Sequence, residues 1–184
     1  SLSDVENLIK RHIRENNIEY CFYDYIHTSL KILEEVSKKS GGVTICNLRI
    51  GDKKINAPFY ITKPNMVVIT KEEYLFKFDM INDIKENGIL VINTMKTDMN
   101  AFLPNQVKKI INAKNVKLYT IDAETIALNA GIKGKISKVM EMVILYLIDY
   151  PNALDVVSHS IEKQFATKGE EIINSNKKAI TEAV

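Results

Sequence analysis

Two short runs of the sequence, residues 66–70 (MVVIT) and Ile89–Asn93 (ILVIN), are almost continuously apolar and rich in β-branched residues. Such runs are typical of parallel strands that are buried on both faces of a sheet. Between them, residues 74–86 have the apolar spacing of a helix. Pro104 can start another helix, and residues 116–121 follow as a third strand. This alternation predicts an α/β fold with a parallel sheet and right-handed crossovers.

The first third of the chain predicts two helices and three further strands. The first helix is amphipathic and covers residues 1–17. The second begins at a capping residue, Thr28 or Ser29. Its apolar face would consist of Ile32, Leu33 and Val36. The strands are expected at residues 18–26, 43–50 and 57–61, which are rich in aromatic and β-branched residues.

The last third of the chain predicts helices throughout. Asp122 can cap a helix over Ala123–Asn129, which Gly131 would end. Residues 139–148 are apolar on nearly every side, so we expect them in the core, against a partner domain or against a second copy of the chain. Further helices are expected over residues 152–166 and over residues 168–183, the latter with a capping box of Thr167 and Glu170.

The composition argues against several classes of protein. The net charge is only +2 and neither half of the chain is basic, so we expect no nucleic-acid partner. The longest apolar run is far shorter than the ~20 residues that cross a bilayer, so we expect no membrane partner. Cys21 and Cys46 form neither a disulfide framework nor a zinc site, which suits a reducing cytoplasm. The chain begins at Ser1 without a signal peptide, and we expect a processed or excised piece.

The glycines form neither a dinucleotide-binding G-x-G-x-x-G nor an NTP-binding P-loop. The segment that best fits an anion is residues 38–44, with the sequence KKSGGVT. Paired glycines let backbone N–H groups approach a phosphate, hydroxyls donate hydrogen bonds, and lysines supply charge. The alternative is a flexible connection between a helix and a strand, and the residues alone leave both interpretations open.

Other polar residues have simple structural roles as alternatives to a function. Asn93 and Asp122 end apolar strands, where ligand-contacting residues are often found, but helix capping is the simpler role for Asp122. His159 follows Asp155 by one helical turn, which is the spacing of a surface pair. The G-x-x-G at residues 131–134 is shared with RNA-binding KH domains, but the strands around it do not fit one. No carboxylate pair or nucleophile–base set is visible, so the residues alone predict no catalytic site.

Four stretches of the chain resemble the γ domain of pyruvate:ferredoxin oxidoreductase and related 2-oxoacid:ferredoxin oxidoreductases. They occur in the order and spacing of that family. The stretches are residues 37–44 (SKKSGGVT) with 47–51 (NLRIG); residues 57–61 (APFYI) with 66–68; residues 119–123 (YTIDA) with 126–127, 131 and 134–136; and residues 160–163 (SIEK) with 168–173 (KGEEII), 176 and 179.

The resemblance implies a Rossmann-like parallel sheet with flanking helices and a helical C-terminal tail. It implies a single γ-like domain over residues 1–184, with an atypical segment at residues 1–36. In this family thiamine diphosphate and iron–sulfur clusters are bound by partner domains, and the γ domain helps to close the active site and is associated with coenzyme A (CoA). The resemblance thus implies partners among the other domains or subunits, and an isolated chain without activity. It connects CoA with Lys38, Lys39, Ser40, Gly41, Gly42 and Thr44, and places Asn93 and Ser137 towards the same ligand.

The chain departs from the family pattern around these residues. The relatives' γ domain opens with a strand and a glycine-rich loop, whereas residues 1–17 contain no glycine. Cys46-Asn47 stands where relatives carry Ser-His, and Thr94-Met95-Lys96 where they often carry Cys/Ser-Pro-Trp. Ser137 stands where relatives usually have Asn. Two functions remain: CoA-dependent oxidative decarboxylation of a 2-oxo acid as part of such an enzyme, with electrons passed to ferredoxin, or an assembly module that has lost ligand binding.

Overall fold

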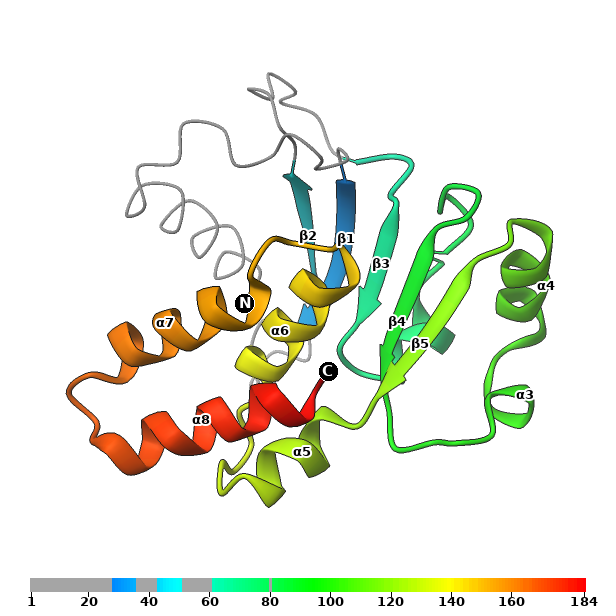
Figure 1. The fold of residues 1–184 in the computed structure, drawn as a ribbon. Coiled ribbons are helices and arrows are strands. Elements are labelled where there is room, and N and C mark those ends of the chain that lie inside the picture. Colours follow the sequence, from blue (N-terminus) through cyan, green and yellow to red (C-terminus); the bar gives the residue numbers. More distant parts are fainter. Residues whose placement is uncertain (1–27, 36–42, 51–60, 80) are drawn as a thin grey trace. The chain divides into compact units, whose positions relative to one another are not determined.

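The computed structural model describes residues 28–35, 43–50, 61–79 and 81–184 (Figure 1). The chain divides after Ile121 into two compact units. The sheet unit lies within residues 26–121, and the helical unit contains residues 122–184. None of the helices in the described ranges has the length and apolar character that a membrane crossing needs.

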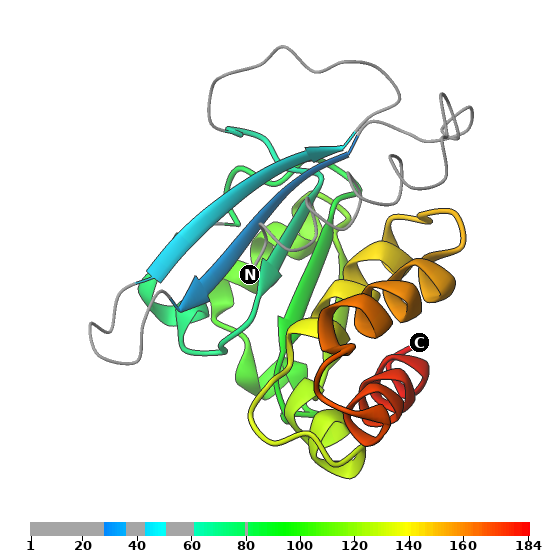
Figure 2. The same cartoon turned by 90° about the vertical axis from the view of Figure 1, so that its left-hand side faces the viewer.

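The sheet unit contains the strands Thr28–Glu35 (β1), Val43–Ile50 (β2), Met66–Ile69 (β3), Ile89–Asn93 (β4) and Lys117–Ile121 (β5). They form one sheet in the order β2-β1-β3-β4-β5. Strands β1, β3, β4 and β5 are parallel, whereas β2 lies antiparallel beside β1 at one edge, as Figure 2 shows. The predicted parallel sheet is confirmed for these four strands. The antiparallel edge has a simple cause, because only residues 36–42 join β1 to β2 and a parallel crossover needs about a dozen or more.

The two β-branched runs form the buried centre of the sheet, as predicted. All four residues of β3 are buried, and so are the last four residues of β4. The predicted strand at residues 116–121 is confirmed as β5, which lies at the other edge and exposes Lys117, Tyr119 and Thr120. The hydrophobic core of the unit adds Tyr74, Leu75, Ile81, Ile84, Leu103 and Val107 to side chains from β3 and β4.

The prediction of a helix that begins at Thr28 or Ser29 is wrong, because Thr28–Glu35 forms strand β1. The spacing of its apolar residues fits a helical face, but β1 pairs with β2 along one side and with β3 along the other. Two ladders of backbone hydrogen bonds outweigh a local helical pattern.

The prediction of a helix over residues 74–86 is confirmed for its first turn and wrong beyond it. Helix α2 covers only Tyr74–Lys77, and Phe78 is already extended. Farther on, the Lys85 N–H donates to the Pro64 carbonyl at 2.9 Å instead of to a carbonyl one helical turn back. This contact holds the segment beside the start of β3, so Ile81 reaches the core without a helix.

Two helices lie between β4 and β5. Helix α3 (Met99–Phe102) is capped by the Asp98 carboxylate, which accepts a hydrogen bond from the Ala101 N–H at 3.1 Å. Helix α4 (Asn105–Ala113) begins directly after Pro104, as predicted, and buries Val107. The helix predicted over residues 1–17 and the strand predicted at residues 18–26 lie outside the described residues. So does the strand predicted at residues 57–61, except for Ile61, which is not in a strand.

The helical unit contains four helices in its described part: α5 (Ala123–Asn129), α6 (Ser137–Leu147), α7 (Ala153–Phe165) and α8 (Glu170–Glu182). The predicted cap of α5 is confirmed, because the Asp122 carboxylate accepts a hydrogen bond from the Thr125 N–H at 3.0 Å. Gly131 follows the helix with φ of 87°, the left-handed conformation expected of a glycine that ends a helix.

Helix α6 is the buried centre of the helical unit. Every residue from Lys138 to Leu145 is buried, which agrees with the apolar character predicted for this segment. Helices α7 and α8 form a hairpin, and both pack against α6. The predicted capping box of Thr167 and Glu170 is wrong: α8 begins after Gly169, whose φ of 93° turns the chain, and no side chain caps it. The Lys168 N–H instead donates to the Phe165 carbonyl and closes the preceding turn.

Candidate functional site

A polar network lies where β3 and β4 end. The Asn93 side chain donates through Nδ2 to the Thr70 carbonyl at 3.0 Å. The Thr94 hydroxyl donates to the Glu72 carboxylate at 2.5 Å and accepts a hydrogen bond from the Lys96 N–H at 3.0 Å. Asn93 and Thr94 are both buried. The network fixes the turn that follows β4 and ties it to the turn that follows β3.

The sheet explains why these side chains meet. In neighbouring parallel strands the carboxyl ends lie along the same border of the sheet, which we call the carboxyl edge, and Ile69 of β3 is in register with Ile92 of β4. The Thr94 N–H then donates to the Ile121 carbonyl of β5 at 2.9 Å, so the turn starts from a fixed position. Ligands of open α/β sheets bind beyond this edge. Asn93 was predicted from the sequence, but Thr94 and Glu72 were not, because residues 22 positions apart give no local pattern.

The described residues that flank the lysine- and glycine-containing segment lie at the same edge. Strand β1 is parallel to β3, with Leu33 in register with Ile69. Strand β1 ends at Glu35, directly opposite Val43, the first residue of β2. The chain therefore leaves and re-enters the described residues at the edge that carries Asn93. Thr44 lies in β2 opposite Glu34, and Lys38, Lys39, Ser40, Gly41 and Gly42 lie outside the described residues.

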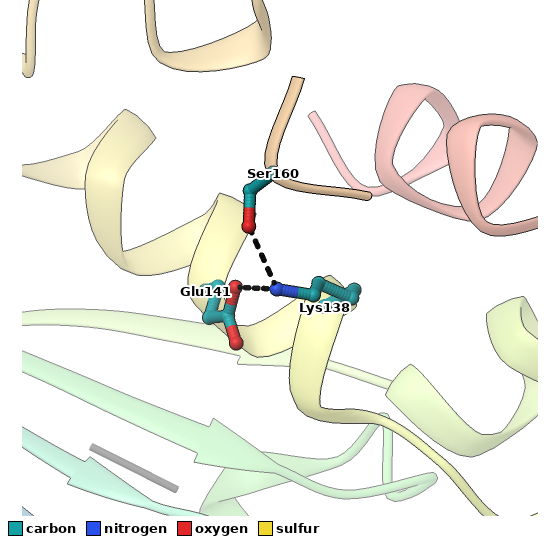
Figure 3. Close-up of polar contacts among 3 residues, drawn as sticks. All are labelled: Lys138, Glu141 and Ser160. Atoms are coloured by element: carbon teal, nitrogen blue, oxygen red, sulfur yellow. Dashed lines mark hydrogen bonds and ion pairs between the residues drawn. The ribbon is translucent and has the colours of Figure 1, made fainter. Parts of the chain in front are cut away.

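Ser137, the remaining candidate residue, belongs to the helical unit. It is the first residue of α6 and it is exposed. The next residue, Lys138, belongs to a buried polar cluster that was not predicted from the sequence and is drawn in Figure 3. The Lys138 ammonium group donates to the Glu141 carboxylate at 2.7 Å and to the Ser160 hydroxyl oxygen at 3.2 Å. The side chains of Lys138 and Glu141 are only 6% and 3% exposed.

This cluster connects α6 to α7, since Ser160 lies in α7. A serine beside a lysine is also an arrangement used for nucleophilic catalysis. Here, however, the ammonium group of Lys138 donates to both neighbours, and all three residues are buried. The cluster thus positions the first turn of α6, where Ser137 lies. The spacing of Lys138 and Glu141 by three residues is the one signal in the sequence, and it normally indicates a surface pair.

The other polar cluster of the helical unit is exposed. A hydrogen bond and the charge of Lys177 in α8 lower the pKa of the Glu162 carboxyl in α7. His159 lies 3.6 Å from the same carboxylate, so it pairs with Glu162 and the predicted pairing with Asp155 is replaced. Among the residues that the structure describes, no group of three or more His, Cys, Asp or Glu side chains could hold a metal ion.

Comparisons with known proteins identify relatives of this chain. The family model described as pyruvate ferredoxin/flavodoxin oxidoreductase matches residues 34–184. Pyruvate-flavodoxin oxidoreductase of Klebsiella pneumoniae is 31% identical over 149 residues, which are 78% of this chain and 13% of the relative. Pyruvate:ferredoxin oxidoreductase of Moorella thermoacetica is 32% identical over 153 residues, which are 80% of this chain and 13% of the relative. The chain thus spans about an eighth of the length of these relatives.

Two solved structures share the fold. Pyruvate oxidoreductase subunit PORC of Thermotoga maritima has a TM-score of 0.62 at 19% identity, over 98% of this chain and 86% of that subunit. The 2-oxoglutarate:ferredoxin oxidoreductase of Magnetococcus marinus, solved with 2-oxoglutarate, CoA and succinyl-CoA, has a TM-score of 0.61 at 16% identity, over 85% of this chain and 25% of that chain. These neighbours are subunits or domains of multi-component enzymes. They confirm the Rossmann-like α/β fold, and the match over residues 34–184 confirms the resemblance: the chain belongs to the pyruvate ferredoxin/flavodoxin oxidoreductase family.

Proposed function

We propose that this chain is the γ domain or γ subunit of a pyruvate:ferredoxin or related 2-oxoacid:ferredoxin oxidoreductase. The observation that carries the proposal is the family match over residues 34–184, together with a fold shared with a separate subunit of such an enzyme. In the proposed reaction the 2-oxo acid loses CO₂ and a pair of electrons, and the CoA thiol takes up the acyl group and releases a proton. The electrons pass to ferredoxin.

The proposed contribution of this chain is to bind CoA and to close the active site. Support comes from the edge of the sheet at which β1, β3 and β4 end. This edge carries the buried Asn93 and Thr94 and both ends of the segment with Lys38, Lys39 and the paired glycines. Backbone N–H groups and lysines are the groups that recognise phosphates, which CoA carries in several places. A relative that shares the fold was solved with CoA bound.

The same proposal assigns thiamine diphosphate and the iron–sulfur clusters to partner domains or subunits. Four cysteine thiolates hold a common cluster, whereas this chain has only Cys21 and Cys46. The proposed location is the cytoplasm, where cysteine thiols stay reduced.

The experiment has two parts. In the first, ferredoxin reduction by the complete enzyme that contains this chain is measured with pyruvate and other 2-oxo acids, with and without CoA. Reduction that requires both substrates supports the proposal. A complete enzyme that shows no reduction with any 2-oxo acid refutes it, and the assembly-module interpretation then replaces it.

The second part is calorimetric titration of CoA into the chain and into Lys39→Ala. One charge-assisted contact contributes about 1.5–3 kcal/mol, so Lys39→Ala should weaken CoA binding roughly 10- to 150-fold. Lys109→Ala, which removes an exposed lysine from α4, is the matched control and should leave binding unchanged. If the wild-type chain binds no CoA at millimolar concentration, CoA is held elsewhere in the enzyme.

A further inference from the structure

A hollow with apolar and polar lining lies in the sheet unit, between α2 and α4. Its volume is about 250 Å³. One wall consists of residues 75–79 and Ile81, which form α2 and the segment after it. The other wall is the start of α4, with Pro104, Gln106, Val107 and Ile110.

Two exposed phenylalanine rings line this hollow. Phe76 is 61% exposed, although its ring packs edge-on against Phe102 with a centroid distance of 5.8 Å. Phe78 is also exposed and packs edge-on against Tyr74 at 5.7 Å. Each ring therefore has one aromatic neighbour in the chain, which restricts its rotamers and lowers the entropy lost on association. Exposed aromatic rings around a small pocket are the anatomy of an energetic hot spot in a protein interface.

The size of the hollow decides what it can accept. Pockets for cofactors and drug-sized ligands measure roughly 300–1,000 Å³, and this hollow is smaller than that range. It has room for one large apolar side chain. Lys77, Asp79 and Gln106 bring charge and hydrogen-bonding groups to its walls, and interfaces typically surround an apolar anchor with such a polar rim.

We infer that this hollow between α2 and α4 receives one large aliphatic or aromatic side chain from another domain or subunit of the same oxidoreductase. The inference rests on the proposed function for the identity of the partner. The relatives are about eight times longer than the matched part, so most of such an enzyme lies outside this chain and is available to cover the patch. A bound anchor would bury Phe76 and Phe78.

The test measures how fast a cysteine at position 76 reacts with a maleimide. Phe76→Cys is compared with Leu128→Cys, since Leu128 of α5 is 60% exposed, nearly the same as Phe76, and does not line the hollow. Each variant is labelled as the dilute chain, in the complete enzyme and in denaturant, and the labelled peptide is quantified by mass spectrometry. In the dilute chain both positions should react within about threefold of the denatured rate. In the complete enzyme position 76 should react at least tenfold more slowly than in the dilute chain.

Three results would overturn the inference. The first is a position 76 that reacts equally fast in the complete enzyme and in the dilute chain. The second is protection already present in the dilute chain, which would mean that the chain covers its own patch. The third is protection that grows with the concentration of the chain alone, which would mean that a second copy is the occupant. If Phe76→Cys does not fold, hydrogen exchange of the peptide containing Phe76 in the wild-type chain and enzyme makes the same comparison.

A second variant tests the hollow rather than the ring. Gln106→Trp fills the space from an exposed position of α4, so it should weaken the contact about 30-fold, the effect of a hot-spot residue, and return position 76 towards the rate of the dilute chain. Lys109→Trp, on the same helix but outside the hollow, should not. Equal effects of both variants would refute a contact inside the hollow. Ferredoxin reduction is measured on the same samples: protection without activity refutes only the proposed function, and activity without protection refutes only this inference.

Discussion

The buried ion pair of α6 gives the sharpest stability prediction. Lys138→Met removes the ammonium group that donates to the Glu141 carboxylate at 2.7 Å, and this carboxylate side chain is only 3% exposed. Removing one partner of a buried pair costs about 3–5 kcal/mol, because the remaining charge is left in a medium of low polarity. For a chain of this size each kcal/mol lowers the Tm by about 2–4 °C, so a drop of roughly 6–20 °C is expected.

The matched variant removes the whole cluster. Lys138→Met/Glu141→Leu/Ser160→Ala replaces all three polar side chains of the cluster by apolar ones, so the ion pair and the Ser160 hydroxyl are removed together. Such replacements are often neutral or stabilising, and we expect the triple variant to recover most of the stability that Lys138→Met loses. Lys177→Met breaks the exposed pair with Glu162 and should leave the Tm nearly unchanged.

The assay is unfolding by urea and by heat, followed by far-UV circular dichroism, since the chain contains no tryptophan. Two results would refute the reasoning. A loss below about 1 kcal/mol in Lys138→Met would mean that solvent reaches the carboxylate. A triple variant as unstable as the single one would mean that steric packing, and not the unpaired charge, causes the loss.

Three further predictions follow from the geometry and the composition. Gly88→Ala should destabilise the chain by about 1–3 kcal/mol in urea denaturation, because a Cβ would lie 2.8 Å from Ile84 Cγ1 and 2.9 Å from the Lys85 carbonyl oxygen; an unchanged midpoint would refute this. Since Lys177 lowers the pKa of Glu162, their pair stabilises the fold above the pKa of an unfolded glutamate, about 4.3, and this contribution disappears as the pH falls through the lower pKa of the folded state. Glu162→Gln should therefore melt slightly below wild type near neutral pH and together with it in acid, and a difference that persists in acid would contradict the assignment. The purified chain alone should show neither the visible absorbance of an iron–sulfur cluster nor 2-oxoacid-dependent ferredoxin reduction, since two cysteines cannot hold a four-cysteine cluster; either signal would contradict the prediction.

The sequence predicts those elements whose own residues decide their structure. Strands β3 and β4 are short and continuously apolar, and Asp122 caps α5 through a bond to a residue three positions on. Strand β1 was not predicted, because its pairing with β2 and β3 stabilises it and the residue pattern of β1 alone does not indicate this pairing. Helix α2 was predicted too long because a distant carbonyl competes for the N–H of Lys85.

The candidate site shows the same limit. Asn93 could be identified because it ends an apolar strand, and parallel strands end at one edge. Its neighbour Thr94 could not, because its partner Glu72 is distant in sequence and follows a different strand. Lys138 was missed for another reason: lysine is almost never buried, and burial with a carboxylate partner is visible only once the helices are packed.

The continuity of the sheet in the sequence has a consequence for biosynthesis. All five strands that the structure describes lie before Asp122, and residues 122–184 contribute none of them. A ribosome therefore releases these five strands before it releases helices α5 to α8. The β1–β2 hairpin, with its short connection, can form within microseconds, whereas the parallel pairings of β1 with β3, β3 with β4 and β4 with β5 must each close a longer loop and are slower. The five described strands can thus be paired, including the apolar β3 and β4, while the last third of the chain is still being synthesised.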